Sequence, residues 1–199
     1  MPFFRELSYI KDTKVRIIDN GKIEHTCVDE IKGVTPRMIL WYFLNRTKER
    51  YQMWHPTHID FQVLSQPIDC GVGSIYYIKE KLEGSPIMID TVADVLEADL
   101  DETKAVILEK FRQCNFPVRV YHRMEAIPGG TRMYSNLTVG SDTPIIGRIQ
   151  NARLRRKMRI FTEEGYRVLF NHVREESRSF EKFLPKLYEE NADARWKGG

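Results

Sequence analysis

The chain lacks any apolar run long enough to cross a membrane. Its longest such run, residues 38–44, has seven residues, whereas a membrane-spanning helix needs about 20. The N-terminal stretch MPFFRELSYI also lacks the charged and then apolar order of a signal peptide. We therefore expect a cytoplasmic protein with no membrane partner.

Cysteines are few, and neither sign of charge is in clear excess. Cys27, Cys70 and Cys114 are well separated and form no CxxC pair, which favours ordinary thiols in a reducing compartment. The 31 basic and 28 acidic residues leave a net charge of +3. This excess is too small to indicate nucleic-acid binding, so no nucleic-acid partner is expected.

One segment departs from this balance. Residues 148–159 contain six basic and no acidic side chains, interleaved with apolar ones such as Leu154 and Met158. A surface for nucleic acid or acidic lipid is one interpretation. The pattern is more typical of the solvated face of a strand, which is the interpretation we favour.

Length and composition are those of an ordinary globular protein. The chain has 199 residues, of which 42% are hydrophobic and 30% are charged. We predict a single domain over residues 1–199, with a core from about residue 14 to residue 190 and a frayed tail over residues 191–199. A homodimer is possible on this composition.

Turn and cap residues divide the first half of the chain into elements. Asn20-Gly21 is a strong hairpin signal between strands over residues 15–18 and 22–26. Thr35-Pro36 begins a helix that runs through residue 44 and, with a break, towards residue 54, where Pro56 stops it. Strands are predicted over residues 59–64, 74–82 and 92–99, with a strand or short helix over 105–110.

The second half predicts a hairpin and a long helix. The hairpin joins residues 117–126 to 131–139 across Pro128-Gly129-Gly130. Residues 145–160 are basic and irregular and are expected to end in a strand. Thr162 caps the final helix, which Pro185 is expected to end or kink. The fold class is α+β, with a mostly antiparallel sheet that curls around the last helix and encloses a cavity for a small, largely apolar ligand.

The final helix carries a polar pair on its apolar face. His172 and Glu176 are four residues apart, so their side chains project side by side. Glu176 fills the gap between Val173 and Phe180 in the apolar face. A carboxylate that faces the core is costly unless it is paired, protonated or bound to a metal.

Two earlier segments offer further metal-binding groups. His55 lies at a helix end directly before a proline, and His58 follows three residues later. Glu80 lies on the apolar face of its strand and should point inward, whereas Glu83 falls on the opposite face. Each group also has a simpler interpretation, as a helix cap, an ion pair or an ordinary helical pair. Their coincidence strengthens the case for a metal site without deciding it, and such a donor set would suit Zn²⁺, with Fe²⁺ or Mn²⁺ as alternatives.

The segment WYFLNRTKERYQMWHPTHI, the later strand with its inward glutamate and the HxxxE helix together resemble a known enzyme family. This is the 2,4-diacetylphloroglucinol hydrolase and phloretin hydrolase family, and the resemblance covers roughly residues 21–180. It implies a Bet v 1-like helix-grip fold, related to START domains, and a zinc-dependent hydrolase that cleaves a carbon–carbon bond between an acyl group and a polyphenol ring. By motif, the family's zinc ligands carry over to His55, Glu80, His172 and Glu176. His58 competes with His55 or is a substrate contact, and Glu83 competes with Glu80.

The mechanism implied by this resemblance is attack of zinc-bound hydroxide on the acyl carbonyl of an acylphenol or β-diketone. Four protein ligands would leave no open tetrahedral position on zinc, so either the ion becomes five-coordinate, or Glu80 or Glu176 lets go and acts as general base. Tyr134, Asn136 and His122 are candidates for holding the phenol oxygens, although His122 is more often a core histidine. The expected partner is a small aromatic ketone or polyphenol.

Two other interpretations stay open on the sequence. The same cavity could belong to a carrier of a small hydrophobic or phenolic ligand, which has no need of a metal. Two histidines and a carboxylate also serve non-haem iron enzymes.

Overall fold

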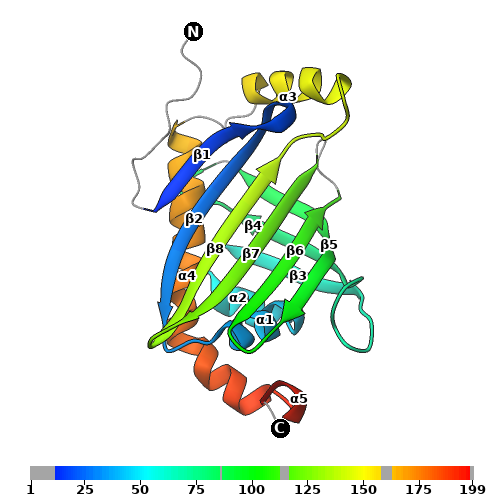
Figure 1. Ribbon diagram of the computed structural model, residues 1–199. Helices are drawn as coiled ribbons and strands as arrows, with labels where there is room; N and C mark the ends of the chain where they lie inside the picture. The colour runs from blue at the N-terminus through cyan, green and yellow to red at the C-terminus, as the bar shows by residue number, and fades with distance from the viewer. Residues whose placement is uncertain (1–11, 86, 113–116, 158–162, 198–199) are drawn as a thin grey trace.

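The computed structural model describes residues 12–85, 87–112, 117–157 and 163–197, which fold around one antiparallel sheet of eight strands (Figure 1). The order across the sheet is β1-β2-β8-β7-β6-β5-β4-β3. The strands are β1 (Thr13–Ile18), β2 (Lys22–Lys32), β3 (His58–Ser65), β4 (Ile75–Lys81), β5 (Met88–Leu100), β6 (Lys104–Phe111), β7 (Val118–Ile127) and β8 (Gly130–Val139). The helices are η1 (Asp19–Gly21), α1 (Pro36–Leu44), α2 (Lys48–Trp54), α3 (Ile146–Lys157), α4 (Glu163–Asn191) and α5 (Ala194–Lys197).

Both predicted hairpins and the first helix cap are confirmed. Asn20 and Gly21 adopt φ of 60° and 73° in the turn from β1 to β2, a conformation that asparagine and glycine tolerate. Ile127 pairs with Gly130 across Pro128 and Gly129, so the second turn is short. The Thr35 hydroxyl accepts a hydrogen bond from the amide of Met38 and caps α1.

The strongly curved sheet wraps around α4, which is the helix-grip arrangement expected from the sequence (Figure 1). One apolar cluster joins α1 to the later part of α4 and contains Trp41, Phe43 and Phe180. A second cluster joins β1 and β2 to the early part of α4 and contains Tyr166 and Phe170. His172 and Glu176 fall between these two groups along α4, so the candidate polar site is set between two apolar clusters.

The basic segment is a helix, which corrects the expected strand. Residues 146–157 form α3, whose arginine, leucine, glutamine and alanine residues have favourable helix propensity. Interleaved apolar and basic residues therefore did not mark a strand face. The expected strand end at residues 158–160 and the Thr162 cap lie outside the described residues.

Of the two outcomes expected at Pro185, an end or a kink of the last helix, the structure shows no end, and the described part of the tail is not frayed as expected. Pro185 lies inside α4 and does not end it, because Leu184 and Tyr188 pack on the core on either side of it. The helix changes direction towards its C-terminal end (Figure 1). The tail was expected to fray, but α5 folds back, with Trp196 only 8% exposed and its carbonyl accepting a hydrogen bond from the Tyr188 hydroxyl.

The ambiguous segment at residues 105–110 is a strand, β6. Among the described helices, none is long and apolar enough to span a membrane.

Candidate metal centre

Four potential ligands from three elements converge on one point. His58 is the first residue of β3 and lies directly opposite Glu80 of β4 in the sheet register. His172 and Glu176 come from α4, which lies against this edge of the cavity. One ligand atom from each of the four side chains lies within 4.8 Å of the ligand atoms of the other three.

The contacts within this group are close. His58 Nε2 lies 2.9 Å from Glu176 Oε1 and 3.3 Å from Glu80 Oε2. His172 Nε2 lies 3.5 Å from Glu176 Oε1 and 3.9 Å from Glu80 Oε1. Two imidazoles and two carboxylates therefore share a space of the size that one cation would occupy.

The orientation of His58 is fixed by α2. Its Nδ1 donates a hydrogen bond of 2.7 Å to the carbonyl of Tyr51, and its ring stacks on the Tyr51 ring with centroids 3.9 Å apart. This contact directs Nε2 towards the two carboxylates, as an outer-shell hydrogen bond does for a metal-binding histidine. Burial lowers the pKa of His58 to about 4, although the negative charge of Glu80 acts to raise it. The ring is therefore neutral at neutral pH.

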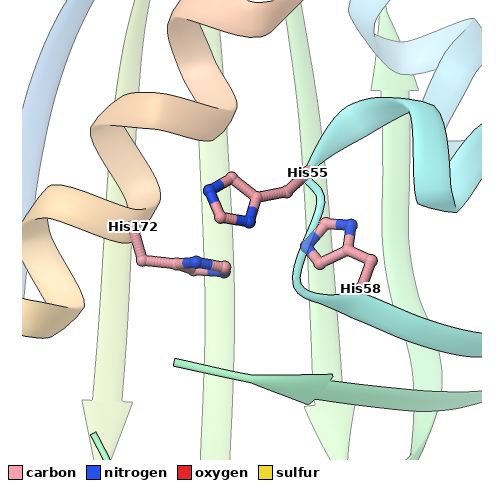
Figure 2. A group of neighbouring side chains, drawn as sticks. All are labelled: His55, His58 and His172. Carbon is pink, nitrogen blue, oxygen red and sulfur yellow. The ribbon is translucent and has the colours of Figure 1, made fainter. Parts of the chain in front are cut away.

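His172 supplies the clearest sign that the group is incomplete. The residue is only 4% exposed, yet neither ring nitrogen has a hydrogen-bond partner among the described residues. Figure 2 shows its ring extending from α4 towards the rings of His55 and His58. Buried polar groups without partners are rare, and those that occur call for an explanation such as a bound ion. Burial also lowers the pKa of His172, which favours the neutral form that binds metals.

The two carboxylates place negative charge in the same buried space. The Tyr51 hydroxyl donates to Glu80, which holds that side chain in place. Burial raises the pKa of Glu176, and the nearby Glu80 charge raises it further. A divalent cation would offset both effects, so the donor set fits Zn²⁺, and it is equally compatible with Fe²⁺ or Mn²⁺.

His55, the ligand implied by the family resemblance, lies beside this group. It forms one possible ligand group with His58 and His172, and another with Glu83 and Glu175. None of the groups found among the described residues joins it to Glu80. The reason is local: α2 ends at Trp54, and the following turn brings His58, the competing candidate, opposite Glu80.

His55 is itself buried, but one of its contacts, the carboxylate of Glu175, is exposed. Its Nε2 lies 3.1 Å from Glu175 Oε2, and its Nδ1 lies 2.7 Å from the Thr57 hydroxyl. The ring of His172 is 4.4 Å away, centroid to centroid. A second hollow, lined by Glu83, Glu175 and His172 among others, adjoins this side of the group.

A cavity of about 120 Å³ lies on the inner side of the group. Glu80, His172 and Glu176 form part of its wall, and most of the remaining wall is apolar, including Phe43, Ile78, Leu169, Phe170 and Val173. An engineered apolar cavity of about 150 Å³ binds benzene, so this space suits roughly one aromatic ring.

The cavity wall also carries a buried ion pair that the sequence analysis missed. Arg46 donates to Glu109, and the two side chains are only 2% and 5% exposed. The guanidinium lies 5.0 Å from the Phe61 ring centre and 5.1 Å from that of Tyr76. Glu109 follows Ala105 and Ile107 on the inward face of β6. The period-two alternation that predicts an inward Glu80 places Glu109 inward as well, once this segment is known to be a strand.

The candidates for holding a phenol are divided by the sheet. His122 faces the cavity, 3.0 Å from the Ser135 hydroxyl and stacked on Phe43. Tyr134 was expected there as well, but it does not line the cavity, and its ring lies 4.4 Å from the Arg123 guanidinium. Side chains alternate along β8, so Met133 and Ser135 point inward and Tyr134 points outward. The prediction that Tyr134 holds a phenol oxygen in the cavity is therefore wrong.

Asn136 is among the cavity-lining residues, but its side chain is occupied elsewhere. The amide contacts the hydroxyls of Thr26 and Thr138. The thiol of Cys27 also lines the cavity, where burial raises its pKa to about 12 and keeps it protonated. This agrees with the expectation of an ordinary thiol.

Comparison with known proteins shows the fold. No protein-family model matches the chain, and no curated protein matches it in sequence. Human STARD10 matches in structure with a TM-score of 0.59 and 8% identity, over 90% of this chain and 72% of that one. The ginseng major latex-like protein 151 from Panax ginseng matches with a TM-score of 0.58 and 7% identity, over 82% of this chain and 97% of that one.

A START superfamily protein from Mycobacterium smegmatis matches with a TM-score of 0.52 and 11% identity, over 82% of this chain and 98% of that one. The chain therefore has the Bet v 1/START-like helix-grip fold, which confirms the expected fold class.

Proposed function

We propose that this protein is a metal-dependent hydrolase that cleaves the carbon–carbon bond between an acyl group and a phenolic ring, or within a β-diketone. The observation that carries the proposal is the buried meeting of His58, Glu80, His172 and Glu176 at the wall of a ring-sized cavity. The resemblance to the 2,4-diacetylphloroglucinol and phloretin hydrolases supports the reaction class.

In this proposal the four side chains hold one zinc ion, with iron or manganese as alternatives. When bound, zinc supplies Lewis acidity to an acyl carbonyl and makes water more acidic. Besides holding the ion, one of the two carboxylates would serve as general base towards the attacking water. We assign that role to Glu176, because the Tyr51 hydroxyl holds Glu80 in place. Glu176 then accepts a proton from the attacking water.

The leaving ring needs a proton on the carbon that carried the acyl group. The hydroxyl of water ends on the acyl carbon, giving a carboxylic acid, and the proton ends on the ring carbon. His55 is buried beside the four side chains, oriented by Glu175 and Thr57, and its ring adjoins that of His172. We assign His55 to moving this proton, in place of the ligand role that the resemblance implies.

The other cavity wall would orient the ring. The Arg46–Glu109 pair can both donate to and accept from a phenol hydroxyl, and the His122–Ser135 pair offers a second polar contact. These groups take the place of Tyr134, which lies on the outer face.

Elemental analysis of protein purified without chelator or affinity metal tests the proposal, together with turnover of an acylphenol. The test variant is His172→Ala/Glu176→Ala, and the matched control is Lys186→Ala/Glu190→Ala, an exposed pair at the same spacing on the same helix. We expect about one zinc per chain and acylphenol hydrolysis in the wild type and control, and neither in the test variant. Metal retained by the test variant would refute the site.

A carrier of a small phenolic or hydrophobic ligand is the second candidate, because the cavity wall is largely apolar. A folded, metal-free wild type that binds acylphenols without consuming them would establish the carrier. About one iron per chain would direct the search to oxygen-dependent chemistry.

A further inference from the structure

Helix α3 is held firmly on one side. Asn151 accepts a hydrogen bond from the amide of Ser141 and donates to the carbonyl of Asn20, at 2.7 and 2.9 Å. Arg155 donates to the carbonyl of Gly21. A side chain at Gly147 would come within 2.8 Å of Asn20, so the helix packs closely on the first hairpin. This side of α3 is therefore fixed to the scaffold.

The opposite side of α3 faces solvent and has a distinct composition. Ile146, Ile149, Arg153 and Arg156 fall within about 80° of one another at 3.6 residues per turn, away from the packed side. Ile146 and Ile149 are 60% and 52% exposed, and both arginines are exposed. Figure 1 shows α3 at one end of the sheet, with α1, α2 and α5 towards the other end.

The residue before the helix extends this apolar surface. Ile145 is 76% exposed and has a φ of 60°, a left-handed conformation that a β-branched residue rarely adopts. A strained backbone that presents an isoleucine to solvent, next to two more exposed isoleucines, is unusual for a surface that meets only water.

The segment that contains α3 carries charge of one sign. Residues 143–162 contain no acidic side chain. The nearest preceding acid, Asp142, pairs with Lys22 and Arg119. Arg153 and Arg156 form no ion pair with any described residue. The helix thus presents, beside exposed isoleucines, two arginines that pair with no acidic side chain in the described part of the chain.

We infer that the outer face of α3, formed by Ile145, Ile146, Ile149, Arg153 and Arg156, docks on the surface of a membrane that contains anionic phospholipids. The isoleucines enter the boundary between headgroups and acyl chains, and the arginines contact the lipid phosphates. Nucleic acid would use the arginines but would leave the isoleucines in water, so lipid fits the whole surface better. This inference revises the expectation of no membrane partner and is independent of the metal site.

Flotation of the full-length protein with vesicles tests the inference. One set of vesicles is phosphatidylcholine, and the other is phosphatidylcholine mixed with phosphatidylserine. We expect binding to the mixed vesicles only, weakened by salt. Arg153→Gln/Arg156→Gln should weaken it about 25-fold, at about fivefold per arginine. Ile146→Ser/Ile149→Ser should weaken it about tenfold or more.

The matched control is Ile68→Ser/Arg178→Gln, which changes an exposed isoleucine and an exposed arginine elsewhere and should bind as the wild type does. No binding to mixed vesicles, or an equal loss in the control, would overturn the inference. So would a dimer in sedimentation that Ile146→Ser/Ile149→Ser dissociates, because the face would then be covered by a second copy. RNA binding that survives the serine changes, without vesicle binding, would point to nucleic acid.

Discussion

Two groups of buried polar side chains at the cavity differ in how fully their members hydrogen-bond to one another. Arg46 and Glu109 pair directly, and His122 contacts Ser135. In the other group, His172 lacks a hydrogen-bond partner among the described residues although two carboxylates are near. A self-satisfied pair stabilises and orients, whereas a buried nitrogen without a partner calls for an explanation such as a bound water or ion. We therefore assign the cation to the second group.

The largest expected effect separates the two histidines at the end of α2. His58→Ala should weaken zinc binding by more than about 100-fold, beyond the range typical of outer-shell changes. His55→Ala should leave zinc stoichiometry unchanged while turnover falls. Competition with a chromophoric chelator measures the first and an acylphenol assay the second. If His55→Ala lost zinc and His58→Ala kept it, the metal ligand would be His55 and not His58.

The Arg46–Glu109 pair should contribute to folding stability and not to metal binding. Arg46→Met alone should lower the free energy of unfolding by about 3–5 kcal/mol, because it leaves Glu109 charged and buried without a partner. Arg46→Met/Glu109→Leu should recover most of this loss. Urea unfolding measures both variants, and zinc content should stay unchanged in each. A loss of zinc in the double variant would show that the two groups are coupled.

A smaller effect concerns pH in the metal-free protein. Burial, with the nearby charge of Arg46, lowers the pKa of His122 to about 3. The unfolded chain binds this proton below about pH 6.5, but the folded chain does not until about pH 3, so folding stability falls as pH drops through that window. The loss reaches about 3 kcal/mol near pH 4.

Urea unfolding between neutral pH and pH 4 should therefore show a shallower decline in His122→Phe than in the wild type. Ser135→Ala, which keeps the buried imidazole, serves as the control and should retain the steep decline. Equal slopes in all three proteins would mean that His122 is protonated in the folded state.

The smallest effect tests the outer support of the cation group. Tyr51→Phe removes the hydroxyl that donates to Glu80 and should weaken zinc binding about 10–100-fold. Tyr42→Phe is the matched control, because the Tyr42 hydroxyl is also buried but donates to the carbonyl of Arg50. Equal effects of the two changes on zinc affinity would show a general loss of packing.

The elements that could be predicted from sequence are those with local signals. The Asn20-Gly21 and Pro128-Gly129 turns and the Thr35-Pro36 helix start were predicted from their own residues. Residues 146–157 were not, because interleaved apolar and basic residues suit either element when neighbours are unknown. The course of α4 through Pro185 depends on distant packing, which a local rule cannot supply.

The candidate site shows the same division. Period-two alternation placed Glu80 inward, and helical spacing placed His172 beside Glu176. Neither rule chooses between His55 and His58, which are three residues apart around a turn. The same alternation along β8 places Tyr134 on the outer face, opposite to Met133 and Ser135.

By itself, the sequence determined which side chains are chemically able to bind a metal and which faces of strands and helices are apolar, because these follow from residue type and backbone period. Tertiary structure alone decided that His58 meets Glu80 across the sheet, that Arg46 finds Glu109, and that α3 keeps isoleucines in solvent. Each of these depends on contacts between segments that are far apart along the chain, whose register and packing no local pattern specifies.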